Sequence, residues 1–373
     1  MLKKKITKFI YLFVNILFLL KYGQRQDYIS YYILILIYFI LIYFYFTFIE
    51  KHYFFSLFKK KTYIFLSLFV AILLLIIINN VDGYSLNVDR WSAMHYALKA
   101  WLNGEYAYSA TDHLNGRTSN FPGLLLIGLP FYLIGNVALL QVFSFLLLSY
   151  TLIKTTKVKE AFSFLFLLLL SPAYWWEIFA FSDLLSNIII IFCTIRLFFY
   201  YYNINYFKKY LLSGVILSIV CLTRAIVYIP FTIFLFKDFI KLEYNYKMKF
   251  LVTFLLTSFS LILLFFYSCD SLDTLIKHNP LTLQKSWSPD YVTIITLLLP
   301  IWISLKAKLE NYNFLSGLTL FFIVFLSFSY FFLNLGYHAV FFNHKFDLSY
   351  FTMCFPFIIA EITSTKNPDE NRD

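Results

Sequence analysis

Residues 81–122 read VDGYSLNVDRWSAMHYALKAWLNGEYAYSATDHLNGRTSNFP and interrupt long apolar runs on both sides. This stretch, called the polar island below, combines acidic, basic and histidine side chains between two apolar runs. Among them are Asp82, Asp89, Arg90, His95, Glu105, Asp112, His113 and Arg117. The flanking runs therefore determine the class of fold, and the island is where we expect any active site.

The composition places the chain in a membrane. Hydrophobic residues make up 61% of the 373 residues, aromatic residues 23% and charged residues only 14%. A soluble domain of this length has too little interior to bury so much apolar surface. We therefore predict an all-α, polytopic transmembrane protein that forms a single integral membrane domain over residues 1–373.

The apolar runs predict about twelve membrane spans, since a span needs about 20 apolar residues. They cover roughly residues 6–20, 29–49, 62–79, 136–153, 160–173, 183–202, 210–224, 226–240, 249–268, 291–305, 313–333 and 349–362. The run 123–134 is shorter and is interrupted by Gly128 and Pro130. We expect it to form a juxtamembrane or re-entrant segment instead.

The charge pattern predicts the orientation. A net charge of +11 is compatible with nucleic-acid binding, but the lysines cluster in short groups between apolar runs. With the N-terminus in the cytoplasm, roughly twice as many Lys and Arg residues fall inside as outside, as the positive-inside rule requires. We therefore expect membrane lipids and no nucleic acid as partners. The polar island then lies on the outer, periplasmic face of a bacterial inner membrane.

Within the island, one segment has the pattern of an amphipathic helix. From Trp91 onward apolar residues recur at helical spacing, at Met94, Leu98, Trp101 and Leu102. The segment is too polar to span a bilayer and suits a juxtamembrane helix that lies in the interface. Asp89 precedes it and Gly104 follows it. Two interpretations of Asp89 stay open: an ordinary N-cap, or a carboxylate held over a cavity at the membrane surface.

The order of short motifs in the island resembles the first outer loop of the GT-C glycosyltransferases. Closest is the branch that contains the protein mannosyltransferases and the lipid A aminoarabinose transferase. The motifs are Asp89-Arg90, Gly104-Glu105-Tyr106 fifteen residues on, His113-Leu114-Asn115-Gly116, and Phe121-Pro122-Gly123. That branch has Asp-Glu in place of Asp89-Arg90, and Lys-Pro-Pro in place of the last motif.

Three later segments add weaker likenesses to the same family. Glu177 and Ser182-Asp183 resemble the second outer loop and the start of its span. Thr223-Arg224, followed by Pro230, resembles a Thr-Arg at the outer end of a middle helix. Lys345, with Tyr350 and Pro356 after it, resembles a late Arg-Tyr segment in which Lys replaces Arg.

The resemblance implies an enzyme that transfers a hexosyl or pentosyl group, with inversion, from a polyprenyl-phosphate carrier to a lipid or glycan acceptor. It implies Asp89 as the general base, and Arg224, Lys345 and Arg117 as cations for the donor phosphate. The residues expected to bind substrate are Asp82, Arg90, Glu105, His113, Glu177 and Asp183. We expect neither a metal nor another cofactor.

Two other classes stay open. A lipid-linked polysaccharide polymerase would be expected to carry two Arg-rich outer loops, whereas the outer loops here are rich in acids with scattered single cations. A flippase or transporter of a lipid-linked saccharide would favour paired charges within the spans or an inverted repeat. The sequence shows neither of these last two features.

Overall fold

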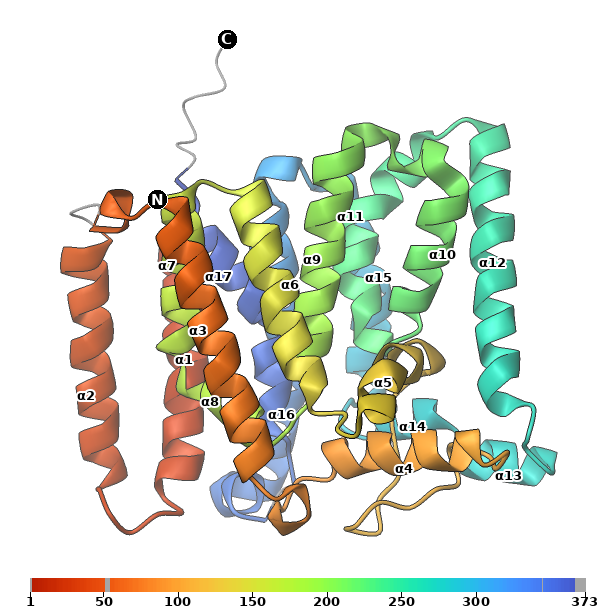
Figure 1. Ribbon diagram of the computed structural model, residues 1–373, viewed down its shortest axis with the longest axis horizontal. Coiled ribbons are helices and arrows are strands. Elements are labelled where there is room, and N and C mark those ends of the chain that lie inside the picture. The colour runs from red at the N-terminus through yellow and green to blue at the C-terminus, as the bar shows by residue number, and fades with distance from the viewer. Residues whose placement is uncertain (1, 51–53, 344, 366–373) are drawn as a thin grey trace. The chain divides into compact units, whose positions relative to one another are not determined.

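The computed structural model describes residues 2–50, 54–343 and 345–365. Over these residues the chain forms helices and turns without a strand (Figure 1). One isolated antiparallel bridge, between Thr111 and Arg117, lies in the polar island. The prediction of an all-α protein is thus confirmed.

Six helices in the described residues are long and apolar enough to cross a membrane. They are Leu2–Gly23, Tyr31–Ile49, Lys60–Asn80, Leu184–Tyr202, Tyr244–Phe266 and Leu309–Phe341. Each coincides with one of the predicted spans. An integral membrane protein with several transmembrane helices is therefore supported by the structure as well as by the composition.

Three further pairs of helices reach the required length only together, because each pair is sharply bent. Pro122–Ile134 meets Leu139–Thr155 at 113°, Val158–Leu169 meets Pro172–Phe179 at 67°, and Leu272–Lys285 meets Asp290–Lys306 at 72°. The first bend agrees with a re-entrant or juxtamembrane segment at 123–134. Counting each pair as one span gives nine, so the figure of about twelve stays a prediction.

The contacts divide the chain into two compact units, and the single domain over 1–373 also stays a prediction. Unit 1 comprises Met1–Ile72, Leu146–Trp176 and Asn313–Asp373. Its elements are α1 (Leu2–Gly23), α2 (Tyr31–Phe44), η1 (Tyr45–Ile49), η2 (Phe54–Leu57), most of α3 (Lys60–Asn80), the second half of α6 (Leu139–Thr155), α7 (Val158–Leu169), most of α8 (Pro172–Phe179), α16 (Tyr312–Phe341), η7 (Leu348–Cys354) and α17 (Phe355–Thr363).

Buried hydrogen bonds and aromatic packing hold unit 1 together. The Tyr11 hydroxyl donates to the Leu167 carbonyl over 2.6 Å, and the Ser171 hydroxyl donates to the Asn15 amide oxygen over 2.6 Å. Both bonds join α1 to the α7–α8 segment. Phe13 of α1 packs edge-on against Phe321, Phe325 and Phe351. Such polar bonds between helices compensate for the lack of a hydrophobic driving force inside a bilayer.

Unit 2 comprises Leu73–Phe145 and Glu177–Tyr312 and contains the polar island. Its elements are η3 (Gly83–Ser85), α4 (Arg90–Leu102), α5 (Pro122–Ile134), α9 (Leu184–Tyr202), η4 (Asn203–Lys209), α10 (Tyr210–Cys221), η5 (Ala225–Val227), α11 (Tyr228–Lys241), α12 (Tyr244–Phe266), α13 (Leu272–Lys277), α14 (Pro280–Lys285), α15 (Asp290–Lys306) and η6 (Leu309–Asn311). Figure 1 shows α4 lying across one end of this unit, nearly perpendicular to α9 and α12.

Two long helices of unit 2 differ in burial although both are apolar all round. In α9, 67% of the most apolar window is buried inside the protein, whereas in α12 the share is 17%. A uniformly apolar sequence fits both situations, because lipid is as good an apolar surrounding as a protein core. Thus α9 is the central helix of unit 2, and α12 exposes most of its surface.

The start of α5 is held against the end of α10 by the backbone. The Phe121 amide donates to the Thr223 carbonyl over 3.2 Å, and the Gly123 amide donates to the Leu222 carbonyl over 2.7 Å. Pro122 occupies the first turn, where its missing N–H group costs no hydrogen bond. A Cβ atom on Gly123 would lie only 2.0 Å from the Ile219 carbonyl oxygen. The Phe-Pro-Gly motif therefore permits a close backbone approach that no larger residue allows.

The substitution Gly123→Ala is expected to separate α5 from α10. The added Cβ atom clashes with backbone atoms, which cannot turn aside as a flexible side chain can. We expect a loss of about 1–3 kcal/mol of stability, as for other overpacked sites. The measurement is the melting temperature of the detergent-solubilised protein. Gly104→Asn is the control, since Gly104 has φ +82 with no atom within 4 Å of an added Cβ, and Asn tolerates this region. Equal melting temperatures for the two variants would contradict the argument.

Candidate functional site

The predicted surface helix is present as α4, directly after Asp89. It ends at Leu102, and Gly104 follows with φ +82, the left-handed conformation expected of a glycine after a helix. Asp89 occupies the N-cap position but has φ −87 and ψ −14, and its side chain makes no capping hydrogen bond. Asp89 therefore occupies the N-cap position, as the first interpretation expects, but its side chain does not cap the helix. Its carboxylate is directed elsewhere.

That carboxylate lies beside a second one, from Asp112. An added Cβ on Gly116 would lie 3.0 Å from Asp89 Oδ2 and 2.7 Å from Asp112 Oδ2. Two carboxylate oxygens thus flank the same glycine, and the absence of a side chain at Gly116 is what leaves space for both. Asp112 is 5% exposed, and its Oδ2 atom is buried without a hydrogen-bond partner.

The other oxygen of Asp112 builds the turn in the His-Leu-Asn-Gly motif. Asp112 Oδ1 accepts hydrogen bonds from the amides of Leu114, over 2.8 Å, and Gly116, over 2.9 Å. Asn115 has φ +62 at the tip of this turn, a conformation that Asn tolerates better than most residues. The motif is therefore a tight turn organised by the aspartate that precedes it, and the turn brings Asp112 to Asp89.

His113 joins the same turn to α4 and to the segment before it. Its Nε2 atom donates to the Leu86 carbonyl over 2.9 Å, and its Nδ1 atom lies 2.6 Å from the Ser92 hydroxyl. Both ring nitrogens therefore contact protein groups. This predicted substrate-binding residue holds the turn in place in the structure described here.

A second polar cluster joins the start of α4 to the segment before α9. Arg90 Nη1 donates to the Ser182 hydroxyl over 2.6 Å and lies 3.9 Å from Glu177 Oε1. Glu177 has a side chain only 1% exposed, and its Oε2 atom accepts from the Leu185 amide over 3.2 Å. Gln141 donates to the carbonyls of Glu177 and Ser182. The Arg90–Glu177 pair is thus buried and hydrogen-bonded, as buried charges in proteins generally are.

A third cluster is centred on Arg224. Its Nη2 atom donates to Asp183 Oδ1 and to Asn120 Oδ1, each over 2.7 Å, and Asn120 Nδ2 donates to Asp183 Oδ2 over 2.7 Å. The side chains of Arg224 and Asp183 are 5% and 6% exposed. This closed triangle fixes the end of the polar island, the segment before α9 and the end of α10 relative to one another. Arg224, predicted to bind phosphate, is therefore already paired.

The segment 269–290 lies against the third cluster and against the polar island. Gln284 of α14 donates to the Ser119 carbonyl over 2.6 Å and accepts from the Ala225 amide over 2.7 Å. Arg117 Nη1 donates to His278 Nδ1, between α13 and α14. These hydrogen bonds join the segment to the polar island and to the residue that follows Arg224.

A small cavity lies between Arg90 of the second cluster and Asp183 of the third. A cavity of about 10 Å³ is lined by residues of α4, the start of α6 and the segment before α9, among them Arg90, Met94, Gln141, Ser182 and Asp183. A cavity of this volume holds about one water molecule. The side chains around this cavity are thus closely packed, and a sugar ring does not fit in it.

Three predicted site residues do not belong to these clusters. Asp82 is exposed and caps η3, accepting from the Tyr84 amide over 3.0 Å. Glu105 is exposed just beyond the end of α4. Lys345 is exposed and belongs to unit 1. The structure therefore brings together Asp89, Arg90, His113, Arg117, Glu177, Asp183 and Arg224, all of unit 2, with their neighbours.

The residues of these clusters that were not among the predicted site residues include Asp112, Asn120, Gln141, Ser182 and Gln284. Asp112 and Ser182 directly precede predicted residues, which is a signal available in the sequence. Asn120 and Gln284 carry no such signal, because their partners are 104 and 165 residues away. Among the described residues, no group of three or more His, Cys, Asp or Glu side chains has the arrangement of a metal site.

No protein-family model, no curated protein and no solved structure matches this chain.

Breaking the Arg224 triangle is expected to destabilise unit 2. In Arg224→Met, the Asp183 carboxylate stays buried without its cation, which costs about 3–5 kcal/mol in comparable pairs. Lys285→Met is the matched control, because it removes an ion pair of 2.8 Å with Asp290 in which both side chains are largely exposed. The melting temperature of the solubilised protein should fall markedly for the first variant and stay unchanged for the second. Similar shifts in both would show that burial does not matter here.

Asp112→Ala is expected to loosen the turn at residues 112–116, whereas Asp112→Asn is expected to keep it. In Asp112→Asn an amide oxygen still accepts from the Leu114 and Gly116 amides, whereas Asp112→Ala leaves both donors without this acceptor, at about 1–3 kcal/mol each. Limited proteolysis of the solubilised protein, with cleavage mapped to residues 105–121, measures the difference. Ala should be cleaved faster than wild type and Asn should not. Equal cleavage of the two variants would contradict the role of Oδ1 in the turn.

Proposed function

We propose that the protein is a membrane glycosyltransferase of the GT-C type, which transfers a sugar from a polyprenyl-phosphate donor to a lipid or glycan acceptor on the outer face. The observation that carries the proposal is the position of Asp89. It occupies the N-cap site of the surface helix α4 without capping it, and its carboxylate instead faces the Asp112 carboxylate across Gly116. A carboxylate that does not cap its helix and lies close to a second, buried carboxylate is a candidate general base.

In the proposed reaction, an oxygen of the acceptor hydroxyl attacks the anomeric carbon of the donor sugar. Asp89 takes the proton of that hydroxyl as the new carbon–oxygen bond forms. The bond between the anomeric carbon and the phosphate oxygen breaks, and the polyprenyl phosphate leaves with the electron pair. Attack opposite the leaving group inverts the anomeric centre, by the same logic as an inverting hydrolysis in which water is the nucleophile.

The leaving phosphate needs a cation, and we propose Arg117 for this task in the closed arrangement described here. Arg117 is in the same loop as Asp112 and is partly exposed, with His278 as its contact. A guanidinium group suits bidentate binding of phosphate. Arg224 is held by Asp183 and Asn120, so its proposed task is to position these segments. Lys345 stays a predicted phosphate ligand from unit 1.

The test is sugar transfer in membranes that contain the protein and a series of radiolabelled polyprenyl-phosphate sugars. Asp89→Asn should lower transfer about a hundredfold or more, since the amide is no base. Asp82→Asn, which changes an exposed aspartate in the same island, should leave transfer unchanged. Expression and melting temperature of both variants provide the check on folding.

Two results would contradict the proposal. Equal transfer by wild type and Asp89→Asn would remove Asp89 as the base. Absence of transfer from wild type with every donor would remove the polyprenyl-phosphate sugar as the donor class.

The role of Arg117 is tested in the same assay. Arg117→Gln should raise the donor concentration needed for half-maximal transfer and slow the maximal rate, because the charge on the leaving group grows in the transition state. Lys99→Gln, which removes an exposed cation of α4, is the control. Loss of the same size in both variants would indicate a general effect of surface charge.

A further inference from the structure

A separate cavity lies at the other end of unit 2. Its volume is about 360 Å³, within the range of sites for small ligands, which starts near 300 Å³. We call it the lysine pocket. Its lining comes from the last turns of α9, α11 and α15 and from η4, η6 and the first residue of α16: Phe199, Tyr206, Ile233, Phe234, Lys237, Asp238, Ser304, Ala307, Lys308, Leu309 and Tyr312.

The pocket lies at the end of unit 2 opposite α4. The helix α9 begins at Leu184, next to the Arg224 triangle, and ends at Tyr202, past the lining residue Phe199. Figure 1 accordingly shows the ends of α9, α11 and α15 away from α4. The charge pattern of the sequence predicts that this end faces the cytoplasm, where anionic and zwitterionic headgroups meet the protein.

The walls of the pocket are aromatic and rigid. Tyr206 stacks on Phe234 with ring centroids 5.5 Å apart, and Phe234 meets Tyr312 edge-on at 5.3 Å. The Tyr312 hydroxyl donates to the Pro230 carbonyl over 3.2 Å. These contacts fix the apolar side of the pocket, which suits the hydrocarbon next to a headgroup.

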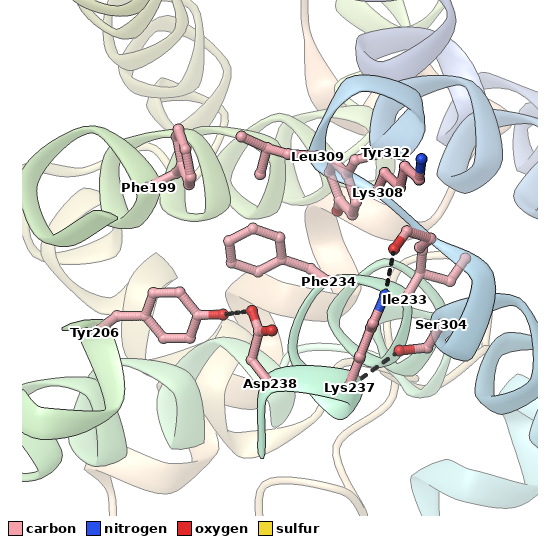
Figure 2. A pocket seen from close by; sticks show the side chains of 11 residues that line it. Phe199, Tyr206, Ile233, Phe234, Lys237, Asp238, Ser304, Lys308, Leu309 and Tyr312 are labelled. Carbon is pink, nitrogen blue, oxygen red and sulfur yellow. Dashed lines mark hydrogen bonds between the residues drawn. The ribbon is translucent and has the colours of Figure 1, made fainter. Parts of the chain in front are cut away.

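Its charged groups lie on two sides, as Figure 2 shows. The Lys237 ammonium donates to the Ala307 carbonyl at the end of α15 over 3.3 Å, and its backbone amide donates to the buried Ser304 hydroxyl over 3.2 Å. Lys308 follows Ala307 and lies on the same side of the picture. An ammonium group has three protons, so the single long bond to Ala307 leaves Lys237 donors for a ligand.

The Asp238 carboxylate lies on the other side, where its Oδ2 atom accepts from the Tyr206 hydroxyl. Burial, together with the nearby Asp238 charge, raises the pKa of Tyr206 well above its usual value, so the hydroxyl keeps the proton that it donates. This bond fixes Asp238 towards Tyr206 and away from Lys237, although the two residues are adjacent in the chain. The second carboxylate oxygen can still accept from a ligand.

A pocket with two ammonium groups on one side, a carboxylate on the other and aromatic walls between them matches a ligand with both charges. We propose that the lysine pocket binds a phosphoethanolamine group, with the phosphate at Lys237 and Lys308 and the primary ammonium at Asp238. The same group occurs on a phospholipid and as a soluble ester. The membrane helices that line the pocket favour the lipid, phosphatidylethanolamine. This inference does not depend on the proposed glycosyl transfer.

The test is lipid binding to the full-length protein in a non-ionic detergent, measured by native mass spectrometry. Three phospholipids with the same short acyl chains are compared: phosphatidylethanolamine, phosphatidylglycerol and phosphatidylcholine. Wild type should bind phosphatidylethanolamine about tenfold or more tightly than the other two. The reason is that phosphatidylglycerol has no ammonium for Asp238, and phosphatidylcholine has no N–H group to donate to it.

Three variants test the cationic side and the anionic side of the pocket separately. Lys308→Gln and Lys237→Gln should each weaken phosphatidylethanolamine about tenfold, and Asp238→Asn should remove the preference for it over phosphatidylglycerol. Lys308 is exposed outside the helices, so its variant tests the proposal even if Lys237→Gln does not fold. Lys241→Gln is the matched control, because Lys241 is an exposed lysine of α11 that does not line the pocket.

Three outcomes would overturn the inference: equal binding of the three lipids, a preference that survives in Asp238→Asn, or the same loss in Lys241→Gln as in Lys308→Gln. Soluble phosphoethanolamine distinguishes the sources. If it displaces the lipid at a similar concentration, the pocket binds the group itself. If it does not, the acyl chains contribute and the ligand is the lipid.

Discussion

The hydrogen-bonded triangle of Arg224, Asp183 and Asn120 is the interaction on which the rest of the polar end of unit 2 depends. Each member comes from a different segment, and each pair of the triangle is joined over 2.7 Å. In a nearly dry interior, an ion pair of this kind is costly to break because either partner alone would be a buried charge. Residues next to the triangle bind two further side chains: the Ser182 hydroxyl accepts from Arg90, and the Ser119 carbonyl accepts from Gln284. The triangle therefore joins the polar island to the segments next to α9 and α10, beside the contacts of Arg90 with Ser182 and of Phe121 with Thr223.

Much of the fold could be predicted from the sequence because bilayer thickness imposes a length on apolar runs. The six longest helices coincide with predicted spans for that reason. The helix α4 was predicted from the recurrence of apolar residues after Trp91, together with Asp89 and Gly104 at its ends. The shorter apolar segments, such as α7 and α10, were correctly expected to be helical. Whether each crosses the membrane depends on bends, which hydropathy does not record.

The side-chain partners within the candidate site could not be predicted in the same way. The position of Asp89 before a helix indicated an N-cap, yet the carboxylate lies beside Asp112, because the turn at residues 112–116 folds back onto α4. Arg224 at the end of a helix was expected to face a phosphate, yet it meets Asp183, 41 residues earlier. Local patterns give the positions of charged residues along helices. Pairing between distant segments depends on tertiary packing, to which a single sequence gives little access.

One contact of α4 has a mechanical consequence. The Trp101 indole donates to the Leu264 carbonyl over 2.9 Å and stacks on Phe265, so the end of the surface helix is fastened to the last turn of α12. The helix α12 is 23 residues long and exposes most of its surface, so a span of this length can meet a thinner or thicker hydrocarbon layer by tilting. A change of tilt moves the end of α12, and with it the depth of α4. The position of the surface helix is thus coupled, through Trp101, to a helix whose outer side faces lipid rather than protein.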